Sequence, residues 1–221
     1  STGLQNNMKY DKAFLTGCDY KHEWILPWFF ENYKKHNNVP LVFADFGIKN
    51  RDLLTNNVHA IINLANTVEK GWFKKPKAML NCPAEKTVWI DTDCEILSNI
   101  EDIFDLLKPN KLNMVEDKPW TKRRGDYGPW YNSGVVGFIG KPSILKQWSK
   151  WILESNQVGD QEVLYERLDQ LQKLTYINPL PNEYNWLRVQ LENDNQNSWD
   201  KKIIHWTGYK GKEKIKELIN A

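Results

Sequence analysis

One segment of the chain joins an apolar strand pattern to closely spaced carboxylates: Thr87-Val-Trp-Ile-Asp-Thr-Asp-Cys-Glu-Ile96. Side chains two positions apart on a strand point to the same face, so Asp91, Asp93 and Glu95 converge if the chain stays extended. Two unit charges about 4 Å apart repel by roughly 4 kcal/mol at an effective dielectric constant of about 20, so such a cluster usually holds a proton or a cation. The segment therefore predicts a divalent-cation site. Carboxylate oxygens suit Mg²⁺ or Mn²⁺, which in turn bind phosphate oxygens of a substrate.

Length and charge narrow the class of protein. The 221 residues fit one domain with a sizeable core. The net charge is only +2, with acidic and basic residues interspersed, which argues against a nucleic acid as the main partner. The longest apolar stretches fall short of the roughly 18 to 20 residues that a membrane-spanning helix needs, and no signal-peptide pattern opens the sequence. We therefore expect a soluble, cytoplasmic protein.

Cysteines, tryptophans and the first residues add little chemistry. Cys18, Cys82 and Cys94 cannot all pair and lack metal-ligand spacing, which favours reduced thiols. Aromatic rings can stack on sugars, but most of the 11 tryptophans are expected in the core. Residues 1–7 are polar and precede Met8, so we expect a cloning remnant or disorder there, followed by one domain at residues 8–221.

Alternating strand and helix patterns predict an α/β fold. The expected strands are residues 12–18, 39–46, 88–91, 112–116, 135–139 and 202–206, and the expected helices are residues 24–35, 72–81, 103–107, 143–154, 160–171 and 213–219. The first strand, helix and strand have the size of a βαβ unit, whose strands are parallel. Ser98-Asn-Ile-Glu101 matches a capping box ahead of the third helix. The acidic cluster then lies at the carboxyl end of a strand, where open α/β sheets bind ligands.

Four short motifs follow one another in a characteristic order: Asp91-Thr-Asp93, Tyr131-Asn-Ser-Gly-Val135, Gly159-Asp-Gln161 and Ile204-His-Trp-Thr-Gly208. Each motif is weak alone, but their order and spacing resemble the nucleotide-sugar glycosyltransferases of the GT-A fold. The chain is most similar to glycosyltransferase family 8, which includes glycogenin and bacterial galactosyl- and glucosyltransferases. The resemblance implies a single Rossmann-like GT-A domain, with a mostly parallel central sheet flanked by helices.

The resemblance also assigns a metal centre and catalytic residues. It makes Asp91, Asp93 and His205 the ligands of Mn²⁺ or Mg²⁺, which holds the diphosphate of a UDP-sugar, and it places Asn132, Asp160 and Gln161 at the reacting sugar. Charge neutralisation on a departing diphosphate is chemistry that a metal ion supplies. The alternative makes Asp93 a turn residue and His205 a buried structural histidine.

Residues that bind the donor are implied in the same way: Thr16, Gly17, Cys18, Asp45, Lys75, Lys77, Thr92, Ser133, Gly208, Lys210 and Lys212. Gly and Asp are also common turn residues, and basic residues often form a solvated helix face. Only one of Lys75 and Lys77 is expected to reach the donor. The family usually has a lysine six positions after the histidine, but here position 211 is glycine, so either flanking lysine can supply the diphosphate contact.

Residues 117–131 are predicted to form a long loop that closes over the donor. Trp120 and Trp130 would be sugar platforms, with Arg123 or Arg124 near phosphates. The resulting hypothesis is metal-dependent transfer of a hexose, glucose or galactose, from a UDP-sugar to an acceptor hydroxyl, with retention of configuration implied by the family. A sugar-phosphate nucleotidyltransferase and a non-catalytic sugar-binding protein are the alternatives.

Overall fold

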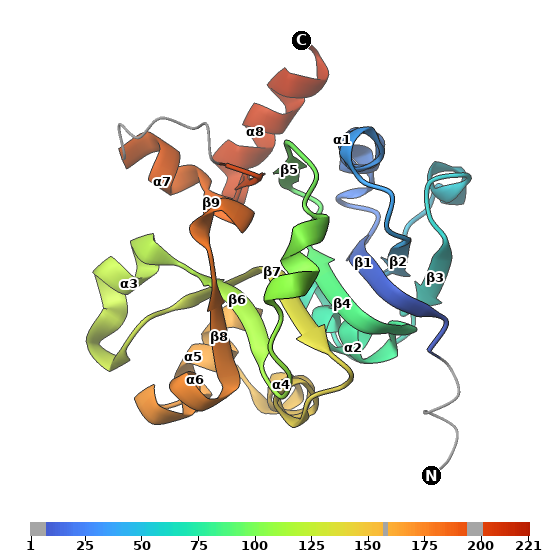
Figure 1. Ribbon diagram of the computed structural model, residues 1–221. Helices are drawn as coiled ribbons and strands as arrows, with labels where there is room; N and C mark the ends of the chain where they lie inside the picture. Colours follow the sequence, from blue (N-terminus) through green and yellow to red (C-terminus); the bar gives the residue numbers. More distant parts are fainter. Residues whose placement is uncertain (1–7, 157–158, 194–200) are drawn as a thin grey trace.

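Seven strands form a central sheet in the order β3-β2-β1-β4-β7-β6-β8, and three short strands form a second sheet in the order β5-β10-β9 (Figure 1). The computed structural model describes residues 8–156, 159–193 and 201–221, so the proposed remnant at residues 1–7 lies outside the described residues. The strands are β1 (Tyr10–Cys18), β2 (Leu41–Asp45), β3 (Ala60–Asn63), β4 (Ala84–Ile90), β5 (Cys94–Ile96), β6 (Leu112–Glu116), β7 (Tyr131–Ile139), β8 (Ile177–Leu180), β9 (Trp186–Leu187) and β10 (Ile203–His205).

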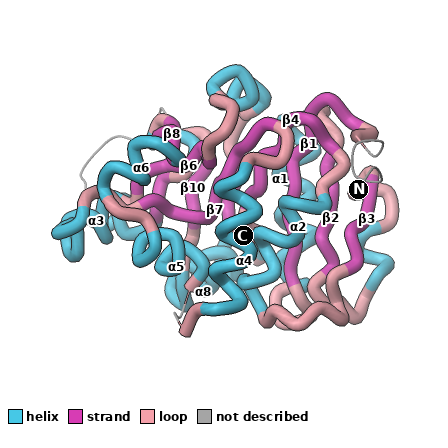
Figure 2. Tube along the Cα trace, turned by 90° about the horizontal axis from the view of Figure 1, so that it is seen from below, coloured by secondary structure: helices cyan, strands magenta, loops and turns pink. Residues whose placement is uncertain are grey.

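The central sheet is mostly parallel, as predicted. β1 pairs in parallel with β2 and β4, and β2 pairs in parallel with β3. β7 is the exception, because it runs antiparallel to both β4 and β6. Figure 2 shows β1, β2 and β3 side by side, with α3 at the opposite end of the molecule. The carboxyl ends of β1, β2 and β4 therefore lie at one edge of the sheet.

Helices cover both faces of this sheet. The α-helices are α1 (Leu26–His36), α2 (Lys75–Asn81), α3 (Lys118–Arg124), α4 (Ser143–Glu154), α5 (Asp160–Arg167), α6 (Gln170–Tyr176), α7 (Arg188–Asn193) and α8 (Gly208–Ile219). The 3₁₀ helices are η1 (Glu23–Ile25), η2 (Arg51–Leu54), η3 (Gly71–Lys74), η4 (Glu101–Leu106), η5 (Gly125–Tyr127) and η6 (Asn182–Tyr184). One core cluster unites the sheet with α2, α4 and α5, and the other unites it with α1 and η4.

The apolar run of β2 explains this two-sided arrangement. Val42 and Ala44 belong to one core cluster, while Leu41 and Phe43 belong to the other, because alternate side chains point to opposite faces. All four side chains are buried. A strand buried on both faces is typical of parallel sheets covered by helices on each side.

Three details of the sequence prediction are wrong. Residues 117–131 are not a continuous loop, since α3 and η5 lie within them. The helix predicted at residues 160–171 is broken into α5 and α6, because Asp169 and Gln172 form a capping box that starts a new helix. The capping box at residues 98–101 is absent: η4 begins without a side-chain cap, and Glu101 instead accepts hydrogen bonds from Val39 N (3.0 Å) and Asn99 Nδ2 (2.7 Å).

The small second sheet brings the end of the chain to the acidic cluster. β10 pairs antiparallel with β5, so that His205 lies opposite Cys94. β10 also pairs in parallel with β9, a two-residue strand that the sequence pattern did not indicate. In this way His205, which lies more than a hundred positions after β4 in the sequence, reaches the carboxyl end of that strand.

The helices of the described ranges are all too short or too polar to cross a membrane. All three cysteines are free and buried.

Candidate active site

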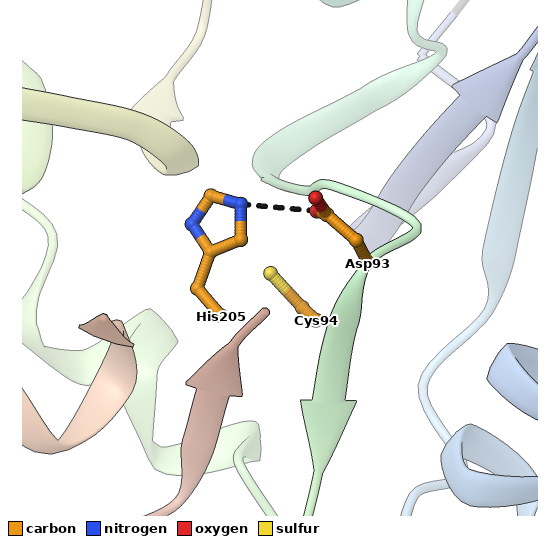
Figure 3. Close-up of side chains that lie close together, drawn as sticks. All are labelled: Asp93, Cys94 and His205. Carbon is orange, nitrogen blue, oxygen red and sulfur yellow. Dashed lines mark ion pairs between the residues drawn. The ribbon is translucent and has the colours of Figure 1, made fainter. Parts of the chain in front are cut away.

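Two carboxylates and one imidazole meet where the two sheets join. Asp91 directly follows β4, Asp93 directly precedes β5, and His205 ends β10. The Nε2 atom of His205 lies 3.0 Å from Asp93 Oδ1 and 3.5 Å from Asp91 Oδ2. Figure 3 shows the imidazole facing the carboxylate of Asp93, with the sulfur of Cys94 nearby. The structure therefore brings together the three residues predicted to bind the metal.

The charges of these groups suit a cation. Burial opposes the charged imidazolium, but Asp93 and Asp91 raise the pKa of His205 above its ordinary value. Burial also disfavours the charged carboxylate of Asp93, but His205 and Lys212 hold its pKa well below the usual range. Two carboxylates thus attract positive charge to one position. Oxygen and imidazole ligands fit Mn²⁺ or Mg²⁺, and such an ion can take the place of the imidazole proton.

Cys94 belongs to the same cluster but is a poor ligand for such an ion. Its sulfur, a carboxylate oxygen of Asp93 and a ring nitrogen of His205 lie within 4.8 Å of one another. Burial raises the pKa of the Cys94 thiol, and the charges of Asp93 and Asp91 raise it further. The thiol therefore stays protonated, and a protonated thiol is not a ligand for a hard cation.

Two asparagines fix the orientation of His205. The Nδ1 atom lies 3.2 Å from Asn132 Oδ1 and 3.1 Å from Asn185 Oδ1, while Asn185 Nδ2 donates to Asn132 Oδ1 at 2.9 Å. Gly134 makes room for the ring, because a Cβ atom at that position would lie 2.3 Å from His205 Cε1. Partners on the second ring nitrogen orient a metal-binding histidine and select its tautomer.

A buried lysine links the acidic cluster to the predicted sugar side. Lys75 Nζ lies 3.0 Å from Asp91 Oδ1 and 2.9 Å from Asp160 Oδ2, and only 2% of its side chain is exposed. It also donates to the carbonyl oxygen of Ser133 at 2.8 Å, and Ser133 Oγ donates to Asp160 Oδ1 at 3.0 Å. Burial opposes the charge of Lys75, but Asp160 and Asp91 raise its pKa, so the lysine is cationic.

A network of amides adjoins this lysine. Asn132 Nδ2 donates to Gln161 Oε1 at 3.1 Å and to Asp117 Oδ2 at 3.2 Å, and Gln161 Nε2 donates to the same Asp117 oxygen at 3.2 Å. Asp117 also caps α3 by accepting a hydrogen bond from Trp120 N. Its carboxylate therefore holds both predicted catalytic amides in place.

Most of these residues border one cleft of about 430 Å³; Cys94 and Asn185 are not on its lining. The predicted site residues on its lining are Lys75, Asp91, Asp93, Trp120, Arg123, Asn132, Ser133, Asp160, Gln161, His205, Gly208 and Lys212. Thr92 is buried between the two aspartates, and Glu95 lies outside the cleft, where it accepts a hydrogen bond from Trp206 Nε1 at 3.1 Å. The cleft thus combines the predicted metal ligands with the predicted catalytic residues.

The candidates at the carboxyl ends of β1 and β2 are not brought into the cleft lining. Thr16 and Cys18 are fully buried, and Gly17 packs against the backbone of Ala44. Asp45 accepts hydrogen bonds from Gly47 N and Ile48 N, both at 2.8 Å, and pairs with Arg51 at 2.5 Å. These contacts are those of a turn residue, the alternative weighed for this group.

In each of the two pairs of candidate lysines, one lysine borders the cleft and the other does not. Lys77 points away from the cleft and pairs with Glu69 at 3.5 Å, in contrast to Lys75. Lys212 borders the cleft and pairs with Asp93 Oδ2 at 3.1 Å, whereas Lys210 borders a different groove between α7 and α8. Position 211 has no room for a side chain, since a Cβ atom there would lie 2.1 Å from the Trp206 carbonyl oxygen. The glycine in place of the family's lysine follows from that contact.

The aromatic residues near α3 divide between two cavities. Trp120 and Arg123 border the cleft, whereas Trp130 and Arg124 border a second cavity of about 760 Å³. Trp130 is stacked between Trp120 and Tyr165, with ring centroids 5.6 Å and 3.6 Å away. Both faces of Trp130 are covered, so Trp120 is the better placed of the two for stacking on a sugar.

Several solved glycosyltransferases share the architecture of this chain. The galactosyltransferase LgtC, in complex with donor and acceptor sugar analogues, matches with a TM-score of 0.64 and 14% identity over 94% of this chain and 95% of its own. The glycosyltransferase GlyE of Streptococcus pneumoniae TIGR4 matches with a TM-score of 0.68 and 16% identity over 90% of this chain and 55% of its own. Mouse xyloside xylosyltransferase 1 matches with a TM-score of 0.53 and 12% identity, over 89% of this chain and 97% of its own. The chain has the fold of these glycosyltransferases.

This result confirms the predicted GT-A fold. No protein-family model matches the sequence, and no curated protein matches it.

Sequence reasoning missed Asp117, Trp72 and Glu162 on the cleft lining, and it missed Asn185, which holds His205 and Asn132. A signal existed for Asp117, because an aspartate two positions before Pro119 is typical of a helix N-cap followed by proline in the first turn. No local pattern marks Asn185, whose role depends on contacts with residues 20 and 53 positions away.

Proposed function

We propose that the protein is a metal-dependent glycosyltransferase that moves a hexose, glucose or galactose, from a UDP-sugar to an acceptor hydroxyl. The observation that carries the proposal is the position of His205 at the end of β4, where its Nε2 atom lies 3.5 Å from Asp91 Oδ2 and 3.0 Å from Asp93 Oδ1. The fold shared with sugar transferases supports the same conclusion.

Asp91, Asp93 and His205 would hold Mn²⁺ or Mg²⁺ in this proposal. When bound, such an ion neutralises charge on the departing diphosphate. Lys212 contributes a second positive charge at the same end of the cleft, because its ammonium group already lies against Asp93. Because the lysine offsets part of the negative charge of the carboxylates, they repel a substrate phosphate less strongly.

The sugar would lie toward Asn132, Asp160 and Gln161. The amides of Asn132 and Gln161 are held by Asp117, so they present fixed polar groups to sugar hydroxyls. Asp160 is paired with Lys75 at 2.9 Å, so its carboxylate is already engaged by an ammonium group. We therefore assign Asp160 to orienting and electrostatic roles and infer that the leaving phosphate oxygen takes the proton of the acceptor.

That assignment is consistent with retention of the anomeric configuration, which we propose for the reaction. Inversion would instead require a carboxylate that acts as a base beside the acceptor. Glu162, which follows Gln161 in the chain and lines the cleft, would be the candidate for that base. NMR of the product anomer distinguishes the two. A product of inverted configuration would contradict retention.

Incubation with a panel of UDP-sugars and Mn²⁺ tests the proposal as a whole. Release of UDP that stops with EDTA supports it. Formation of pyrophosphate from a sugar phosphate and UTP would instead indicate a nucleotidyltransferase, and neither product would indicate a sugar-binding protein. The panel also identifies the donor sugar.

A further inference from the structure

A second cavity lies beside the cleft and shares one residue with it. Its lining contains Arg124, Trp130, Glu162, Tyr165, Glu166 and Arg167 among others, and its volume is about 760 Å³. Glu162 borders both this cavity and the cleft, one residue after Gln161. The second cavity therefore adjoins the sugar side of the cleft at Glu162.

The wall between the two spaces is a fixed stack of aromatic rings. Trp120 faces the cleft, Trp130 faces the second cavity, and their ring planes are tilted by only 28°. Trp130 Nε1 and Tyr165 Oη both donate to the carbonyl oxygen of Arg124, at 3.1 Å and 2.6 Å. These bonds tie the end of α3 to α5. The second cavity is thus lined by ordered side chains.

The side chains of this cavity suit a neutral, hydroxyl-rich ligand. Asp126, Glu162, Glu166 and Asp169 outnumber the two arginines, so a phosphate or a second nucleotide is disfavoured. Tyr165 supplies aromatic surface, while carboxylates, guanidinium groups and the amide of Gln172 supply acceptors and donors. The volume falls within the range of pockets that bury small molecules.

We infer that the second cavity binds the next sugar units of the acceptor, so that the enzyme extends an oligosaccharide or glycoside rather than a free monosaccharide. This inference rests on the proposed function, because that function places the reacting sugar beside Asp160 and Gln161. The diphosphate end of the cleft contains Lys212 and the proposed metal ligands, whereas the second cavity contains none of these residues and carries excess negative charge. The acceptor is therefore the substrate that extends into it.

The test uses the full chain with UDP-sugars, Mn²⁺ and a panel of methyl glycosides of mono-, di- and trisaccharides. Glu166 is exposed on α5 and borders the second cavity only, so Glu166→Trp fills that cavity without touching the cleft. Glu31→Trp on α1 is the matched control, since Glu31 is exposed and borders neither space. Arg167→Ala is a second variant, which removes donors from the cavity without adding bulk.

Wild-type protein should prefer an oligosaccharide over its terminal monosaccharide by at least about tenfold in kcat/KM, the equivalent of about 1.4 kcal/mol. Glu166→Trp should abolish this preference through acceptor KM, leaving the KM of the UDP-sugar and the rate with monosaccharide unchanged. Arg167→Ala should weaken the preference, and Glu31→Trp should preserve it. A wild-type enzyme without the preference, or a preference that survives both cavity variants, would overturn the inference.

Failure of the proposed function gives a different result. If no UDP-sugar is turned over, saturation-transfer NMR with the same glycosides still reports binding to the cavity. Signals from the second sugar unit that vanish in Glu166→Trp but persist in Glu31→Trp would support the cavity as a saccharide site. Equal signals in both variants, or none in the wild type, would overturn it.

Discussion

Two sets of aspartates follow strands at the same edge of the sheet, yet their surroundings differ. Asp45, the last residue of β2, is satisfied by Gly47, Ile48 and Arg51, all within six residues of it. Asp93, after β4, is held by His205 and by Lys212, which lies 119 positions away. A carboxylate whose partners come from its own turn has the contacts expected of a structural residue. A carboxylate whose partners come from distant segments marks a position where the fold gathers charge.

The two regions also differ in the groups that balance the carboxylate charge. Arg51 and the turn amides supply the buried carboxylate of Asp45 with partners from within one loop. Asp91 and Asp93 instead share the charges of Lys75, His205 and Lys212 in a buried cluster beside a cleft. Groups held in that way are costly to assemble and are typical of functional sites.

Asp93→Asn should produce the largest difference between the two regions. Turnover should fall by at least about a thousandfold, because several kcal/mol of charge stabilisation are lost and each 1.36 kcal/mol is a factor of ten. Asp45→Asn should lower the free energy of unfolding by about 1–3 kcal/mol but leave Mn²⁺ affinity unchanged. Rates of UDP release measure turnover in both variants, calorimetric titration measures their Mn²⁺ affinity, and urea unfolding measures the free energy of unfolding of Asp45→Asn. Equal activity in Asp93→Asn and wild type would contradict the metal assignment.

Lys75→Met should destabilise the fold itself. Removing the buried ammonium group leaves the carboxylates of Asp91 and Asp160 without their shared cation, which costs about 3–5 kcal/mol. Lys214→Met is the matched change at an exposed pair with Glu217, where we expect less than about 1 kcal/mol. Urea unfolding of both variants measures these free energies. Similar midpoints for the two would show that the buried cluster is not held by Lys75.

Asn185→Leu should weaken metal binding without removing a ligand. The substitution frees one side of the His205 ring, and loss of such a supporting partner typically costs 10- to 100-fold in metal affinity. Titration of the folded variant with Mn²⁺ gives this affinity, and circular dichroism shows whether the variant is folded. Unchanged affinity in a folded variant would mean that Asn132 alone orients the ring.

Lys212→Ala should have the smallest effect of the four, raising the KM for the UDP-sugar by roughly three- to tenfold, about 0.7–1.4 kcal/mol. The side chain is partly exposed, so solvent screens its charge. Lys210→Ala should change this KM by less than about twofold, because Lys210 borders another groove. The reverse order of effects would reassign the diphosphate contact to Lys210.

The sequence predicted the parts of the fold that local patterns encode. Strands such as β2 are continuous apolar runs, and the order of the motifs pointed to the GT-A fold. β9 has only two residues, so it carries no periodic pattern, and the α3 helix was missed because its N-cap Asp117 was read as part of a loop. Local signals were present for α3 and for the break between α5 and α6 but were not used.

The candidate site was predicted where the resemblance named residues and missed where only packing brings residues together. Asp91, Asp93 and His205 do lie together, as the motifs implied. Asn185 has no motif, and its position depends on the contact between β9 and β10. At the carboxyl ends of β1 and β2, sequence does not distinguish donor-binding residues from turn residues, because glycine and aspartate serve both purposes.

The central claim is that Asp91, Asp93 and His205 hold a metal ion that binds the diphosphate of a UDP-sugar. The most direct measurement is ³¹P NMR of UDP with the protein and Mn²⁺, since the paramagnetic ion broadens the resonances of phosphates that it contacts. We predict broadening of the bound UDP phosphates with wild-type protein, beyond that in free solution, and its loss in Asp93→Asn. Broadening that is the same in the variant, or no binding of UDP in either protein, would contradict the account.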